Sequence, residues 1–247
     1  MIRVLAMVAV AGFLVSAVTL SIAVGIAGPG AILHHNAWTW GSHGWGWRHG
    51  RHFHEDRDDG PQTTREIAWS GGSSLDISVP ADVEYTQTDG PAKVVVTGAA
   101  HAVEDVVVED GHIRYADDDS NDFRRLKIVV TAPSVTDFNF SGSETASIAG
   151  YRQDRLSVSV SGYAEVKAAG EARETEIDIS GAGHADLGAL KTKAAKVEIS
   201  GSGDASIAPT ESADVEISGL GSATLLTNPP RLHTNITGAG QIHRPGA

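Results

Sequence analysis

The sequence predicts an all-β fold of the solenoid type, and three observations lead to this prediction. A short phrase recurs six times after residue 138, apolar and polar residues alternate before each copy, and a Ser-Gly or Thr-Gly pair ends each alternating stretch. These pairs begin at residues 141, 161, 180, 200, 218 and 237, so one repeat has about 19 residues. A fixed period of this size is typical of a solenoid, in which each coil buries its apolar face against its neighbours.

Residues 1–33 are predicted to be a membrane anchor or a signal sequence. Residues 4–27 are almost continuously apolar, and Arg3 precedes them. About 20 apolar residues cross a bilayer core, whereas the apolar part of a signal peptide has about 7–15, so the length favours a retained transmembrane helix. We therefore expect the chain to contact a membrane through residues 4–27, and to be secreted if this segment is cleaved.

Residues 34–61 form a predicted juxtamembrane linker rich in tryptophan and histidine. Four tryptophans follow the apolar segment, as in the aromatic belt of a membrane–water interface. Neutral imidazole binds Zn²⁺, Ni²⁺ and Cu²⁺, so the histidines are candidate metal ligands. The alternative is a plain linker whose histidines only gain charge below about pH 6.5. The six candidates are His34, His35, His43, His49, His52 and His54.

The remaining residues, 62–247, form the predicted solenoid domain, and its first half lacks the strict repeat. Apolar residues alternate in SSLDISV (73–79) and in RRLKIVVTAP (124–133), which predicts half-buried strands. Asp110-Gly111 separates two alternating runs and is typical of a two-residue turn, so residues 106–115 are predicted to form a hairpin. We expect RRLKIVVTAP to be the last strand before the repeats.

Each repeat is predicted to contain two strands joined by a glycine corner. Glycine adopts backbone angles that other residues resist, so the chain turns at the same place in every coil. Alternate residues of each strand point inward, and in the second strand a small residue precedes a large one. The expected inward residues of the first strands are Phe138, Phe140, Leu156, Val158, Val160, Ile177, Ile179, Val197, Ile199, Val215, Ile217 and Ile236. Those of the second strands are Ala146, Ile148, Ala185, Leu187, Ala205, Ile207, Ala223 and Leu225.

Repeat length varies by one or two residues at one place, after the second strand. Residues 208–213 and 226–231 are examples, and we expect loops there. Variable edges of solenoids often carry binding. This edge is therefore one candidate location for function.

Outward-facing acids are predicted to stack in three consecutive coils. Asp178, Glu198 and Glu216 each lie two residues before the serine of a Ser-Gly pair, so they would be about 5 Å apart. Like charges at this separation repel, so this acidic ladder lies in screening water or is bridged by a cation. Ca²⁺ and Mg²⁺ take carboxylate oxygens, so the ladder is the candidate metal site of the domain. A solvated polar face is the alternative.

Charge and composition exclude several classes of function. Residues 55–247 carry 16 Lys/Arg and 31 Asp/Glu, a net charge of −15, which does not suit a polyphosphate ligand, so we exclude nucleic acid as a partner. The absence of cysteine excludes disulfides, thiolate metal sites and cysteine nucleophiles. No residue sits in a nucleophile-elbow phrase, and we assign no catalytic residue and no cofactor.

The order of these segments resembles the DUF2807 family, the auto-transporter adhesin head or GIN domain. The resemblance covers residues 66–244 and rests on SSLDISVPADVEYTQTDG, the VVVEDGHIRY hairpin, a strand ending in TAPSV and the repeated IS-G-x-G units. It implies a right-handed, single-stranded parallel β-helix in a bacterial envelope protein. With the signal-like start, it implies an inner-membrane anchor and a periplasmic β-domain. The family has no established catalytic residues, so the resemblance implies little about activity.

Three functions are open on these grounds. The first is a non-enzymatic envelope protein whose solenoid presents a surface for interaction or adhesion to an envelope protein or a glycan. The second is a polysaccharide-active or glycan-binding β-helix protein, because such folds often host clustered carboxylates. The third is an envelope-stress accessory whose His-rich linker responds to metal or pH.

Overall fold

The computed structural model describes residues 61–116 and 124–246 of the 247-residue chain. The predicted anchor at residues 1–33, the membrane contact at residues 4–27 and the six linker histidines all lie outside the described residues. Within the described ranges, the helix α2 (Ala100–Glu104) has five residues, and no helix has the length and apolar character needed to cross a bilayer.

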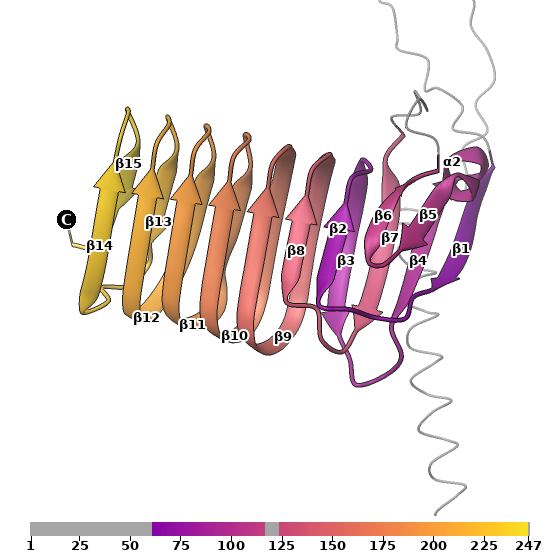
Figure 1. Ribbon diagram of the computed structural model, residues 1–247, viewed down its shortest axis with the longest axis horizontal. Helices are drawn as coiled ribbons and strands as arrows, with labels where there is room; N and C mark the ends of the chain where they lie inside the picture. Colours follow the sequence, from indigo (N-terminus) through magenta and orange to yellow (C-terminus); the bar gives the residue numbers. More distant parts are fainter. Residues whose placement is uncertain (1–60, 117–123, 247) are drawn as a thin grey trace, which may run out of the picture. The chain divides into compact units, whose positions relative to one another are not determined.

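The described domain is a flattened β-solenoid with two faces of parallel strands (Figure 1). Face 1 begins with β2 (Ser74–Ile77) and β8 (Asp137–Phe140) and ends with β14 (Arg231–Ile236). Face 2 begins with β3 (Ala81–Gln87) and ends with β13 (Ser222–Leu225) and β15 (Gln241–His243). Four long strands contribute to both faces: β9 (Ser143–Val160), β10 (Tyr163–Ile179), β11 (His184–Ile199) and β12 (Asp204–Ile217).

The two faces meet at two edges of different character. At the Ser-Gly edge, each Ser-Gly or Thr-Gly pair turns the chain from face 1 to face 2. At the bend edge, β9 to β12 pass from face 2 to face 1 of the next coil as continuous strands, at the lower side of Figure 1. The sequence predicted loops at the bend edge, and for residues 208–213 this prediction is wrong, because β12 runs through them.

The core lies between the faces and confirms the predicted alternation. With one exception, all the predicted inward residues of both strands are buried, and Leu156, Ile177 and Val215 are fully inaccessible. The exception is Ile236, which is 44% exposed although it pairs in register with Ile217. No described residue beyond β14 packs over Ile236, so its inward direction does not bury it.

The Ser-Gly corners need glycine for a different reason from the one predicted. Among the first glycines of the corners, Gly238 alone has a positive φ within the described residues. A Cβ on Gly181 would instead overlap the carbonyl oxygen of Gly162, and one on Gly201 would overlap that of Gly181. The corners stack so closely along the solenoid that a side chain has no room at this position.

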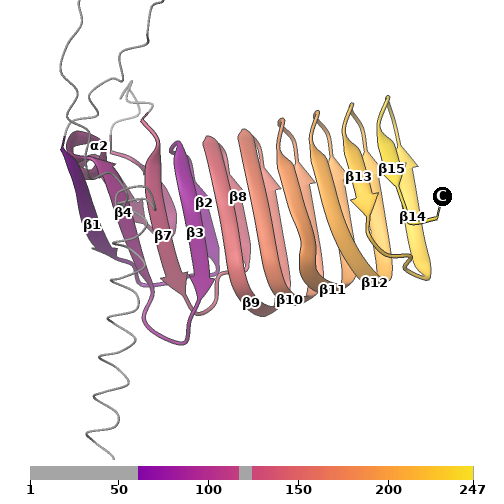
Figure 2. The same ribbon diagram turned by 180° about the vertical axis from the view of Figure 1, so that it is seen from behind.

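The first half of the domain closes the N-terminal end of the solenoid. The strands β6 (His112–Tyr115) and β7 (Leu126–Ala132) pair in parallel with β2 and β3, and so add to both faces. Next come β4 (Lys93–Ala99), antiparallel to β7, and β1 (Gln62–Ala68), antiparallel to β4, as Figure 2 shows. RRLKIVVTAP forms β7, the last strand before the repeats in the chain, as predicted, but in space it is β3 and not β7 that pairs with β9.

The predicted hairpin at residues 106–115 is confirmed. The strand β5 (Val106–Glu109) pairs antiparallel with β6, and the turn residues Asp110 and Gly111 have φ values of 50° and 87°. Two positive φ values are the mark of the type I′ turn, whose twist matches that of the strands that it joins.

Candidate functional site

The acidic ladder that the sequence predicted lies in register on face 1. Asp178 pairs with Glu198 across β10 and β11, and Glu198 pairs with Glu216 across β11 and β12. The Nζ of Lys196 lies 2.5 Å from Oε1 of Glu198 and 3.5 Å from Oε1 of Glu176. The contact with Glu198 raises the pKa of Lys196. The ladder therefore has a cation of the protein itself beside it.

A cation site at the ladder stays a prediction. Among the described residues, no group of three or more histidines and acids is arranged to hold a metal ion. Two of the three carboxylates, those of Asp178 and Glu216, are exposed on the outer side of face 1.

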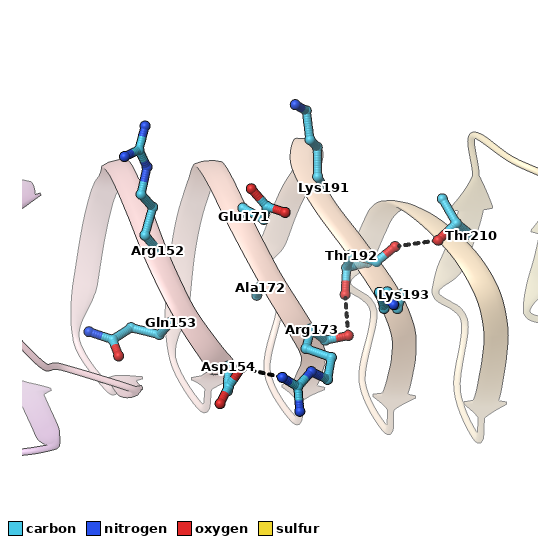
Figure 3. Close-up of a pocket in the computed structure, with 10 residues that line it drawn as sticks. All are labelled: Arg152, Gln153, Asp154, Glu171, Ala172, Arg173, Lys191, Thr192, Lys193 and Thr210. Atoms are coloured by element: carbon cyan, nitrogen blue, oxygen red, sulfur yellow. Dashed lines mark hydrogen bonds and ion pairs between the residues drawn. The ribbon is translucent and has the colours of Figure 1, made fainter.

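A shallow groove forms a second candidate site on the bend edge, the edge that the sequence suggested as a location for function without naming its residues. We call it the bend groove, and it encloses about 830 Å³ (Figure 3). Its charged residues are Arg152, Asp154, Glu171, Arg173, Lys191 and Lys193. The others are Gln153, Ala172, Thr192 and Thr210.

The parallel register places three charged residues of the bend groove in a row of alternating sign. Arg152 on β9 pairs with Glu171 on β10, and Glu171 pairs with Lys191 on β11. Figure 3 shows the side chains of Arg152 and Lys191 extending away from the strands on the same side, with Glu171 between them. In the described part of the chain, none of these three side chains forms a hydrogen bond or an ion pair.

The other cations of the bend groove have acidic partners. The guanidinium of Arg173 lies 3.0 Å from Oδ1 of Asp154, and the ammonium of Lys193 lies 3.2 Å from Oε1 of Glu211. All four side chains are more than half exposed, so water screens these pairs and they stabilise the fold little.

The floor of the bend groove is fixed by hydrogen bonds. Thr192 is buried, and its Oγ1 donates to the carbonyl oxygen of Ala194 at 3.1 Å. Thr210 donates to the carbonyl oxygen of Thr192 at 3.2 Å. The backbone of Arg152 donates to Oε1 of Gln87 at 2.7 Å and accepts from Nε2 of the same side chain at 3.2 Å. The charged side chains therefore stand on a backbone that is held in place.

A bulge between β11 and β12 shapes one end of the bend groove. The four residues 188–191 lie between two paired positions of β11, where β12 has the single residue Ala208. The extra length carries Lys191 outward next to the shorter coil. The sequence signal was present, because RQD (152–154), EAR (171–173) and KTK (191–193) recur at nearly the same distance after their Ser-Gly pairs.

A buried carboxyl lies near the Ser-Gly edge. Glu144 is 1% exposed, its Oε1 accepts a hydrogen bond from the backbone of Gly142 at 2.8 Å, and its Oε2 has no hydrogen-bond partner. Burial raises the pKa of Glu144 to about 7, against the smaller lowering effects of the Gly142 hydrogen bond and of the charge on Arg125. The sequence analysis did not single out Glu144, although SGSE breaks the SGxG phrase there.

Comparisons with known proteins agree with this architecture. A family model described as "Putative auto-transporter adhesin, head GIN domain" (DUF2807) matches residues 73–229. No curated protein matches the chain.

Two solved structures resemble the domain. A "putative adhesin" of Bacteroides fragilis is 23% identical, with a TM-score of 0.59 over 74% of this chain and 97% of its own. A "putative adhesin" of Parabacteroides merdae is 15% identical, with a TM-score of 0.52 over 75% and 97% of the two chains. At these identities the likeness shows the fold alone.

Proposed function

The chain belongs to the DUF2807 family, and from this membership we propose that it is a non-enzymatic bacterial cell-envelope protein whose solenoid binds a partner for interaction or adhesion. The bend groove is the observation that supports the proposal most directly. It is an open surface of charged side chains on a fixed backbone, and three of these side chains have no partner in the described part of the chain. Surfaces of this kind are suited to recognition.

The positions of the acids support binding over catalysis. A glycosidase needs two carboxylates that face each other across the scissile bond. The three acids of the ladder follow one another along the outer side of face 1, and none of them lines the bend groove. A polysaccharide-active enzyme remains the alternative. It would require a pair of catalytic acids other than those of the ladder, Asp178, Glu198 and Glu216.

The envelope location is part of the same proposal. The family description names an adhesin head, and the apolar residues 4–27 are suited to an inner-membrane anchor with the domain in the periplasm. Cleavage of this segment would give a secreted protein instead. The right-handed winding implied by the family resemblance agrees with the strong preference of parallel β crossovers for this hand.

Binding and turnover measured on the same samples test the proposal. The full-length chain is incubated with bacterial envelope fractions and with a panel of envelope glycans. We expect saturable binding without release of reducing ends or unsaturated sugars. Product release would favour the polysaccharide-active alternative, and lack of binding to every fraction and glycan would contradict the proposal.

The His-rich linker gives the third function its own test. Replacement of all six histidines should abolish a response to metal or acid stress if the chain is an envelope-stress accessory. Growth under both stresses that matches the parent strain would contradict this function.

A further inference from the structure

We propose that the bend groove binds an extended anionic polysaccharide that carries one acidic group on every second sugar. Arg152 and Lys191 would each contact one acidic group, and Arg173 and Lys193 would add positive charge beside them. This inference rests on the proposed function, since it names the ligand class of the binding surface described above.

Charge is the first argument. Four of the 16 Lys/Arg of residues 55–247 line the bend groove, against two of the 31 acids, Asp154 and Glu171. A positive patch in a domain of net charge −15 is a local exception, and it favours an anion at this place over the rest of the surface. The low overall charge of the patch also suits a ligand of moderate charge density.

The availability of the cations is the second argument. Arg152 and Lys191 have no ion pair within the described part of the chain, so an anion displaces nothing when it binds them. Arg173 and Lys193 hold exposed acids, Asp154 and Glu211, and exposed pairs of this kind exchange partners at little cost.

Spacing is the third argument, and it decides the pattern of charge on the ligand. Neighbouring strands are about 4.8 Å apart, so Arg152 and Lys191, which are two strands apart, are separated by about 10 Å along the solenoid. One strand spacing is close to the length of one sugar in an extended β-linked glycan. The two cations therefore match acidic groups on alternate sugars.

Glu171 distinguishes a polymer with an acid on every second sugar from one with an acid on every sugar. It lies in the row between Arg152 and Lys191 and forms no ion pair within the described residues. A polymer with an acid on every sugar would place a carboxylate against Glu171, and like charges at this distance repel. A neutral sugar at this position avoids the repulsion.

The same features disfavour nucleic acid. Among the described residues no aromatic side chain lines the bend groove, so they offer bases no stacking platform. A nucleic acid also carries a charge on every residue, so a domain of net charge −15 repels it more strongly than a polymer charged on every second sugar.

Titration of four polymers against the full-length chain tests the inference. Hyaluronate carries an acid on every second sugar, β-1,4-linked polyglucuronate carries one on every sugar, dextran is neutral, and poly(dT) is a nucleic acid. We expect hyaluronate to bind most tightly at low salt and to weaken as ionic strength rises, because exposed charges are screened. Dextran should not bind.

Three variants locate the contact. Arg152→Gln with Lys191→Gln should weaken hyaluronate binding about tenfold, since each exposed charged contact contributes modestly. The matched control is Lys127→Gln with Lys167→Gln, which removes the same charge from exposed lysines paired with Glu84 and Glu165 outside the groove. It should change the affinity less than about twofold. Glu171→Gln should strengthen polyglucuronate binding about threefold and narrow its difference from hyaluronate.

The outcomes separate this inference from the proposed function. Equal losses in the groove variant and the control would overturn the inference while leaving a binding protein. Tighter binding of poly(dT) or of dextran than of hyaluronate would also overturn the inference. So would binding to envelope fractions without binding to any of the four polymers. If the full-length parent protein binds neither the envelope fractions nor any of the four polymers, both proposals are overturned.

Discussion

Glu144 places a titratable group inside the solenoid, so the stability of the protein should depend on pH in a specific way. A carboxyl whose pKa is raised from 4.5 to about 7 by folding binds its proton more tightly in the native state than in the unfolded state. The stabilising contribution of Glu144 to the free energy of unfolding is therefore fully present below pH 4.5 and is lost as the pH rises through 7. Ionisation at higher pH leaves a buried charge whose Oε2 has no hydrogen-bond donor.

The magnitude follows from the two pKa values. The full difference corresponds to about 3 kcal/mol, of which about 2.5 kcal/mol should be lost between pH 5 and pH 8. Glu144→Gln keeps the shape of the side chain and removes the titration. The free energy of unfolding of the parent, relative to this variant, should therefore fall by about 2.5 kcal/mol across this range.

Urea denaturation of both proteins at pH 5 and pH 8 measures this double difference. All other titratable groups are common to both proteins, so their contributions cancel. Glu165→Gln is the matched control, because nearly half of the Glu165 side chain is exposed and its hydrogen bond to Lys167 lowers its pKa instead of raising it. A double difference for Glu144→Gln that equals that of the control would refute the reasoning.

Three further predictions concern stacking, packing and the acidic ladder. Gly181→Ala should lower the free energy of unfolding by about 1–3 kcal/mol, because the added methyl group overlaps the carbonyl oxygen of Gly162. Gly90→Ala is the control in the same urea assay and should have little effect, because Gly90 is exposed and has room for a Cβ. Leu156→Ala should cost about 2–5 kcal/mol because the side chain is fully buried, whereas Leu220→Ala, at a residue 71% exposed, should stay within about 0.5 kcal/mol. If the ladder binds Ca²⁺, millimolar Ca²⁺ should raise the Tm of the parent protein but not that of the double variant Asp178→Asn with Glu216→Gln. Equal calorimetric unfolding traces of the parent with and without Ca²⁺ would contradict a cation site.

The repeated coils could be predicted from the sequence because their determinants are local. The alternation of Val197 and Ile199 and the glycine of each corner depend on near neighbours in the chain, and the fixed period sets the pairing of the coils. The burial of Ile236 was predicted wrongly because alternation gives the direction of a side chain but not what covers it.

The order of strands at the N-terminal end could not be predicted in the same way. The first residues of β3 and β9, Ala81 and Ser143, are 62 positions apart in the chain, and the two strands still adjoin. In contrast, β7 directly precedes β8 in the chain and pairs on the far side of β3. Chain order does not determine which distant strands pair in parallel, because long connections can reach several positions in the sheet.

The candidate sites differ in the same respect. The acidic ladder was predicted because each acid keeps a constant distance from its Ser-Gly pair. The edge of the bend groove was predicted as a location for function, but its residues were missed because its cations come into register only through bulges at this edge, whose exact place the repeat length does not give. Glu144 was missed because its position reads as part of a corner, where most coils have a glycine.

The stacking of coils has a consequence for a protein that holds a ligand under mechanical load. Tension applied along the solenoid axis from the β14 and β15 end would act on the backbone hydrogen bonds between coils one coil at a time, since each coil pairs only with its neighbours. The coil that contains the exposed Ile236 would detach first, and β12 and β13 would follow. Residues 152–193 of the bend groove lie further along the stack, and only Thr210 is on β12. The groove would therefore keep its shape until β12 was reached, and extension of the chain would absorb work before the ligand was lost.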